Sequence, residues 1–201
     1  MMALNQIPYD MCFVKDYTVA VTLSRVHKVV LVDVEKHKLI QDIELSYECF
    51  GVSSDGEVLV ISHAMEAQVL VYNLKDMSSN ILEGIDANRV SLFEGIIYGT
   101  NRWNNTVFSF RITGELLWTL NLKDISSPEG IAVHTNGLVY ISSYDNNRIV
   151  VLSSDGKTSR TILCEEDGIK DPFAMGINRE TGTLLCSSFT KGKEGAFAFK
   201  I

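Results

Sequence analysis

The sequence has no closely spaced cysteine pair and no long apolar run, and each absence argues against a class of protein. No segment reaches the roughly 18 uninterrupted apolar residues of a membrane-spanning helix, and the first ten residues, MMALNQIPYD, lack the basic region and apolar core of a signal peptide. The sequence therefore predicts no membrane association and a cytoplasmic location. The four cysteines form no Cys-x-x-Cys pair, so we expect thiols buried in a reducing compartment, at Cys12, Cys49, Cys164 and Cys186.

Clustered positive charge is also absent. The formal net charge is −7, the pI is about 5.1, and no stretch concentrates Lys and Arg. Proteins that bind nucleic acid neutralise phosphates with clustered basic side chains. The chain is therefore not expected to bind nucleic acid, unless its positive side chains gather on one face.

What the sequence does contain is a repeat, seen most clearly in residues 129–163. Short apolar runs there alternate with polar turns, two of which are Asn136-Gly137 and Asp155-Gly156. Asn-Gly and Asp-Gly suit two-residue hairpin turns, whose central residues take positive φ. The segment predicts an antiparallel meander of four strands.

Four further copies follow the same template along the chain. A repeat of roughly 40 residues with four strands is typical of a β-propeller blade. The sequence thus predicts one all-β domain, residues 1–201, folded as an NHL-like propeller of about five blades. The expected repeats span approximately residues 8–45, 46–85, 86–125, 126–169 and 170–201.

Two details of register are also predicted. The last repeat ends after its third strand, whereas residues 3–7 form a spare strand, so we expect this strand to complete the last blade and to close the ring. A column of small residues between larger apolar ones is expected in the crowded innermost strands, where Leu would not fit: Cys12, Gly51, Ser91, Ala132 and Gly176.

The repeat at residues 128–156 resembles an NHL repeat, with Pro-x-Gly-Ile-Ala-Val, Gly-x-Val-Tyr-Ile-Ser, Asn-x-Arg-Ile-Val-Val and Asp-Gly in order. The segments at residues 8–12, 19–22 and 196–201 are similar to the C-terminal propeller of invertebrate tripartite-motif (TRIM-like) proteins. That resemblance implies the substrate- or partner-binding module of a ubiquitin ligase. The RING finger, B-boxes and coiled coil that precede the propeller in that family, and the first of its usual six blades, do not occur here. The chain is thus either a five-bladed ring or a fragment of a six-bladed one.

Catalytic signatures are scarce. No Gly-x-Ser-x-Gly, His-x-His or His-Glu-x-x-His spacing occurs, and the histidines are expected in solvated turns and loops, at His27, His37, His63 and His134. We therefore predict no catalytic residue, no metal ligand set and no cofactor. One enzymatic alternative stays open, a metal-dependent propeller hydrolase or lactonase, because Glu48 and Glu129 precede innermost strands. RNA binding by an NHL domain is the third interpretation.

A protein- or peptide-recognition module is the function that the residues favour. Loops between the second and third strands of propeller blades open on the same face as the connections between blades. Here these loops are rich in aromatic and Arg side chains, the residues that dominate recognition hot spots. The predicted binding residues are Arg25, His63, Arg102, Trp103, Tyr144, Asp145 and Phe189.

Overall fold

A computed structural model describes residues 6–63, 67–190 and 193–201, and only the backbone of residues 189, 190, 193 and 194. Nearly all regular structure in these residues is β-strand; the exceptions are two short 3-10 helices, η1 (Ser24–Val26) and η2 (Glu165–Asp167). Within the described ranges, neither helix has the length or apolar character needed to cross a bilayer.

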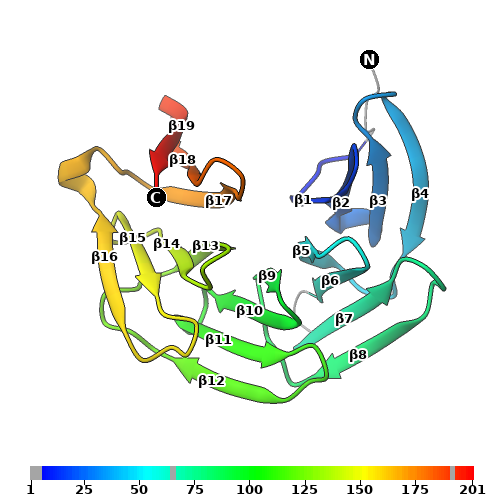
Figure 1. Cartoon of the computed structure of the whole chain (residues 1–201), viewed down its shortest axis with the longest axis horizontal. Helices are drawn as coiled ribbons and strands as arrows, with labels where there is room; N and C mark the ends of the chain where they lie inside the picture. Colours follow the sequence, from blue (N-terminus) through cyan, green and yellow to red (C-terminus); the bar gives the residue numbers. More distant parts are fainter. Residues whose placement is uncertain (1–5, 64–66, 191–192) are drawn as a thin grey trace. The chain divides into compact units, whose positions relative to one another are not determined.

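The strands form five antiparallel sheets, which follow one another along the chain (Figure 1). The described residues give four strands to each of the first four sheets and three to the last. The predicted fold class, an all-β propeller of five blades, is confirmed. The sheets are β1 (Asp10–Lys15), β2 (Thr18–Leu23), β3 (Lys28–Asp33) and β4 (Lys38–Glu44); β5 (Cys49–Ser54), β6 (Val58–His63), β7 (Gln68–Asn73) and β8 (Ser79–Glu83); β9 (Arg89–Phe93), β10 (Ile96–Asn101), β11 (Thr106–Arg111) and β12 (Leu116–Leu120); β13 (Pro128–Val133), β14 (Val139–Ser143), β15 (Arg148–Leu152) and β16 (Ser159–Leu163); and β17 (Pro172–Asn178), β18 (Thr183–Thr190) and β19 (Lys193–Lys200).

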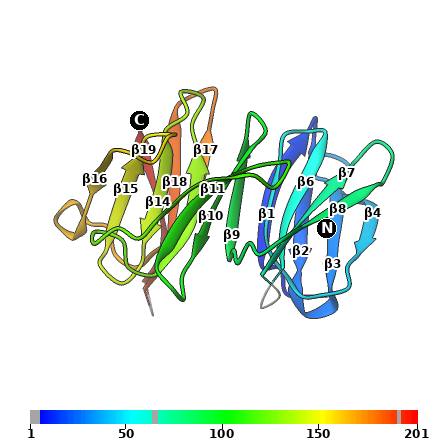
Figure 2. The same cartoon turned by 90° about the horizontal axis from the view of Figure 1, so that it is seen from below.

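The chain divides into two compact units. The first comprises Met1–Ile97 with Ile112–Gly114, and the second comprises Tyr98–Arg111 with Glu115–Ile201. The boundary passes through strand β10 of the third sheet. In Figure 2 the strands of each blade run side by side and alternate in direction.

The core of the first unit lies between its two complete sheets. Successive side chains of a strand point to opposite faces, and in β3 Val29 and Leu31 join a cluster with Cys49, Leu59 and Ile61 of the second sheet. Val30 and Val32 pack on the other face of the same strand. Strands buried on both faces need almost continuous apolar runs, which explains sequences such as VVLV in β3.

The second unit is packed in the same way. Tyr140 and Ile149 of one sheet are buried against Leu184 and Cys186 of the next, with Ile169 from the connecting loop. Burial raises the pKa of the Cys186 and Cys49 thiols to about 11, and that of the Cys12 thiol to about 12. These three groups are therefore protonated near neutral pH. All four cysteines are free; Cys49 and Cys186 are buried as predicted, whereas Cys12 and Cys164 are partly exposed.

A Ser or Thr hydroxyl on the second strand of a blade can link two neighbouring innermost strands by hydrogen bonds. In the second unit, Ser142 accepts a hydrogen bond from Gly130 N at 2.6 Å and donates one to the carbonyl of Phe173 in the next blade at 2.7 Å. Such a side chain satisfies two buried backbone groups at once. Thr22, Ser62, Thr100 and Ser187 occupy the same position in their blades and bond one or both of the equivalent groups.

These contacts correct the predicted small column. Val52 pairs with Ile61 as Ile131 pairs with Ile141, so the residue equivalent to Ala132 is Ser53, and Gly51 lies two positions earlier. Gly51 is nevertheless crowded, because a Cβ there would lie 2.9 Å from Cα of Arg89. Gly176 is wrong as a crowded position, since a Cβ there meets nothing within 4 Å.

The closing strand predicted at residues 3–7 stays a prediction. Residues 1–5 lie outside the described residues, and residues 6 and 7 are not part of a strand.

Candidate functional site

The loops between the second and third strands end in a common backbone conformation. In the first, third and fourth blades they have four residues, and the fourth residue is left-handed, with φ of 54° at His27, 57° at Asn105 and 53° at Asn147; Ala67, the residue before β7, has φ of 47°. A left-handed fourth residue returns the chain directly into the third strand.

In the second unit, one of these loops holds an aromatic ring in solvent. Trp103 is 74% exposed, and the guanidinium of Arg102 lies 4.8 Å from the centre of its ring. The side-chain oxygen of Asn101 accepts hydrogen bonds from the backbone N–H groups of Trp103 and Asn104, at 2.9 and 3.2 Å. The loop is therefore anchored at its base, and the Trp103 ring projects from an ordered turn.

A buried carboxylate fixes the neighbouring arginine. Glu129, the second residue of β13, is 1% exposed, and its Oε1 lies 2.5 Å from Nη1 of Arg102. Thr100 donates a hydrogen bond to the backbone carbonyl of the same residue. A carboxylate removed from water requires such pairing. Glu129 thus orients the Arg102 side chain on which the Trp103 ring lies.

Tyr144 and Asp145, from the equivalent loop of the next blade, serve mainly to hold structure. The ring of Tyr144 packs edge-on against Phe173 at 6.2 Å. The carboxylate of Asp145 accepts hydrogen bonds from Ser127 Oγ at 2.5 Å and from Ser126 Oγ at 3.3 Å. Asp145 therefore ties its loop to the connection between two blades.

Two other predicted residues differ from expectation or remain unassigned. His63 is the last residue of β6 and is 3% exposed, with its ring centre 5.6 Å from that of Tyr47. Its prediction as a solvated loop residue is therefore wrong. Strand β6 extends one residue further than the turn pattern indicated. Phe189 lies in β18, where its backbone pairs with Glu194, and its side chain lies outside the described residues.

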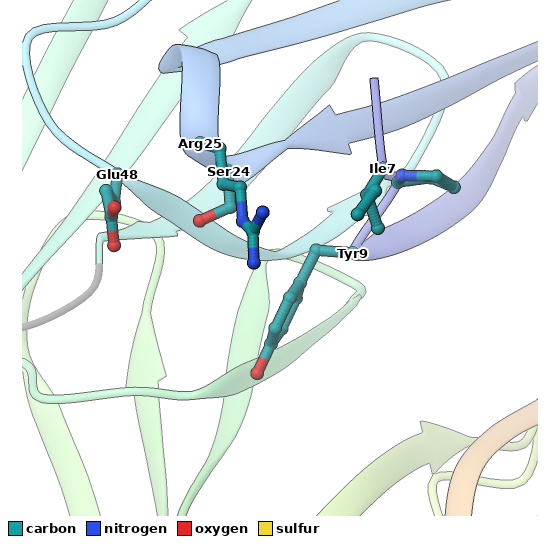
Figure 3. A pocket seen from close by; sticks show the side chains of 6 residues that line it. Ile7, Tyr9, Ser24, Arg25 and Glu48 are labelled. Atoms are coloured by element: carbon teal, nitrogen blue, oxygen red, sulfur yellow. The ribbon is translucent and has the colours of Figure 1, made fainter. Parts of the chain in front are cut away.

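In the first unit, Arg25 lines a hollow of about 280 Å³ together with Ile7, Pro8, Tyr9, Ser24 and Glu48 (Figure 3). Arg25 is the middle residue of η1, in the loop between β2 and β3. Its lining includes residues just before β1 and β5. Arg25 is thus the predicted binding residue of the first unit that is accessible in a concave site.

A buried charged cluster next to this hollow was not predicted. The guanidinium of Arg89, which is 5% exposed, lies 4.4 Å from the ring centre of Tyr9 and 4.0 Å from the carboxylate of Asp10. Burial raises the pKa of Asp10, although the charge of Arg89 acts in the opposite direction. Asp10 and Arg89 occupy the positions held by Gly51 and Gly130 in other blades, an equivalence that the hydrogen bonds of the second-strand hydroxyls establish and that the sequence pattern did not indicate.

Each residue that carried the metal-dependent alternative has a different setting in its own unit. Glu129 is paired with Arg102, and Glu48 lines the hollow of the first unit. Across residues 6–63, 67–190 and 193–201, no group of three or more His, Cys, Asp or Glu side chains is arranged to hold a metal ion.

Several solved structures share the fold. Virginiamycin B lyase from Staphylococcus aureus matches with a TM-score of 0.71 and 13% identity, over 94% of this chain and 69% of that chain. A catalytically inactive variant of the lyase with quinupristin has a TM-score of 0.73 and 14% identity, over 94% of this chain and 66% of that chain. Hydrazine synthase from Kuenenia stuttgartiensis has a TM-score of 0.67 and 12% identity, over 90% of this chain and 55% of that chain. The chain thus spans about two thirds of the lyase and about half of the synthase chain.

No protein-family model matches the chain, and neither does any curated protein. Identities of 12–14% show the fold alone. The resemblance to NHL repeats of TRIM-like proteins is not confirmed by a family match.

Proposed function

We propose that this propeller is a non-catalytic recognition module that binds a protein or peptide through its loops. In this proposal it plays the part of the substrate- or partner-binding propeller of a TRIM-like ubiquitin ligase. The proposal includes a cytoplasmic location, which agrees with the four free thiols.

The observation that carries the proposal is the exposed ring of Trp103 on its anchored base. An indole left in water gains nothing for folding, whereas it supplies a large apolar contact area to a partner. Trp and Arg are the residues most enriched in binding hot spots, and rigid anchors lose little conformational entropy on binding. Arg102, held by Glu129, adds hydrogen-bond donors beside the ring.

The test uses a library of random peptides displayed as internal segments, so that their termini are blocked. Peptides selected on the protein are measured against Trp103→Ala and Arg102→Ala. We expect each to weaken binding by about 2 kcal/mol, or roughly thirtyfold, because anchor residues dominate affinity.

The matched controls are Leu116→Ala, an exposed apolar residue of β12, and Lys157→Ala, an exposed cation in the turn before β16. Melting curves establish that all four variants are folded. Selected peptides that bind both loop variants normally but lose binding to a control would place recognition elsewhere and refute the proposal.

A propeller enzyme is the second candidate, favoured by the fold shared with virginiamycin B lyase. It includes the metal-dependent hydrolase or lactonase that the sequence left open. Incubation with quinupristin, followed by mass spectrometry, separates the two candidates. The recognition proposal expects an unchanged mass, and a cleaved product would favour the enzyme.

RNA binding is third, because it needs a positive loop surface. The connection at residues 164–171 instead carries Glu165, Glu166, Asp167 and Asp171 against Lys170.

A further inference from the structure

The hollow in the first unit combines an apolar side with a charged one. Ile7 and Tyr9 lie on one side of it, and Arg25 and Glu48 lie on the other, with the guanidinium of Arg25 directed into the space between Glu48 and Tyr9 (Figure 3). Its volume of about 280 Å³ is at the lower end of the range for ligand pockets, about 300–1,000 Å³. A space of this size suits a terminal residue better than a folded segment.

The aromatic wall is fixed before any ligand arrives. The ring of Tyr9 stacks on Phe50, with centres 4.7 Å apart and planes inclined by 16°. The guanidinium of Arg89 lies 4.4 Å from the same ring centre, and the carboxylate of Asp10 lies 4.0 Å from that guanidinium. Tyr9 still leaves 39% of its surface exposed. Binding to this preorganised surface costs little ordering of the protein.

The two charges in the hollow are available to a ligand. Among the described residues, no hydrogen bond or ion pair joins the side chain of Arg25 or of Glu48 to another group, including each other. A guanidinium pairs with a carboxylate through two parallel N–H···O bonds. Glu48 can accept an N–H group, whereas it would repel a doubly charged anion such as phosphate.

We propose that this hollow binds the C-terminal residue of a peptide or protein, with a preference for an apolar side chain. The terminal carboxylate pairs with Arg25, the side chain packs against Tyr9, and Glu48 accepts the N–H group of the terminal residue. The inference extends the proposed recognition function to a second site, and it does not depend on Trp103.

The probes are two peptides, acetyl-Gly-Ser-Gly-Leu with a free carboxylate and the same peptide with a C-terminal amide. Their binding to the full chain is measured by calorimetry and by backbone NMR shifts. We expect the carboxylate form to bind about tenfold more tightly, since a charge-assisted bond is worth roughly that factor. The largest shifts are expected at Tyr9 and Arg25. Inorganic phosphate is expected not to compete.

Arg25→Gln is expected to remove the preference for the carboxylate, whereas Arg25→Lys retains part of it. The matched control is Arg160→Gln, at an exposed arginine of β16, which is expected to bind both peptides like the unmodified chain. Any of three results overturns the inference. The two peptides bind equally, the preference survives Arg25→Gln, or neither peptide binds below about 1 mM.

Failure here is distinguishable from failure of the proposed function. The displayed library peptides have no free carboxylate, and their binding depends on Trp103. If they bind normally while the terminal peptides fail, only the second site is refuted.

Discussion

At the scale of single residues, Glu129 connects the interior of the second unit to its exposed loop. Its carboxylate is buried, yet its partner Arg102 keeps 33% of its side chain exposed and lies beside the Trp103 ring. A buried acid is costly unless it is paired, so the burial of Glu129 depends on its pairing with Arg102.

The stability of this pair can be measured by neutralising it. Glu129→Gln is expected to lower the free energy of unfolding by about 1 to 3 kcal/mol, because a charged hydrogen bond is lost in the interior and Arg102 is left beside a neutral amide. Urea unfolding at neutral pH gives the value.

A matched control exists in the same unit. Glu115→Gln removes the exposed pair with Arg111, in which both side chains are more than half accessible, and is expected to change stability by no more than about 0.5 kcal/mol. Similar losses in the two variants would contradict the role given to burial.

At the scale of strands, neighbouring blades of the second unit meet through close backbone approach as well as through apolar side chains. A Cβ at Gly130 would lie 2.4 Å from the carbonyl oxygen of Phe173 and 2.8 Å from N of Met175. These are backbone atoms of β17, so the strand itself would have to move. The hydroxyl of Ser142 bridges the same two strands.

Gly130→Ala is therefore expected to destabilise the protein by roughly 1 to 3 kcal/mol through overpacking. Gly176→Ala, in the adjacent innermost strand, adds the same methyl group where nothing lies within 4 Å, and is expected to be neutral or slightly stabilising. Thermal melts compare the stabilities of the two variants with that of the unmodified protein. A loss at Gly176 that equals the loss at Gly130 would show that crowding does not distinguish these strands.

The sequence predicted the blades but not their detailed register, and the reason lies in strand geometry. A shift of two residues keeps every side chain on its face, so Gly51 and Ser53 were equally acceptable to an apolar pattern. The pairing of Val52 with Ile61 and the hydrogen bonds of Ser62 distinguish them. The bridging Ser and Thr residues and the Asp10–Arg89 pair depend on contacts between segments distant in sequence, which no local pattern contains. The exposed loop residues Arg102 and Trp103 were found because they lie within one predicted turn.

At the scale of the whole molecule, the last sheet differs from the other four. The described residues give it three strands, so the outer side of β19 carries backbone groups that an outer strand pairs in the other blades. Unpaired edges promote aggregation, and propellers protect theirs. The prediction that residues 3–7 supply the missing strand addresses this edge.

Removal of residues 1–7 is expected to lower stability by several kcal/mol, because ladder hydrogen bonds and apolar contacts would be lost together. Differential scanning calorimetry measures the change, with removal of residues 1 and 2 alone as the control. An unchanged melting temperature in the longer deletion would rule out a closing strand in this segment.

The left-handed last residue gives the loops between the second and third strands a common end. His27, Ala67, Asn105 and Asn147 all return the chain to its third strand with nearly the same backbone angle, although their preceding residues have little in common. Substitution of an exposed loop residue such as Trp103 is therefore not expected to change the length of the flanking strands. Local substitution can thus change the side chains that these loops expose, while the hydroxyl hydrogen bonds of Thr22, Ser62, Thr100 and Ser142 beneath them stay in place.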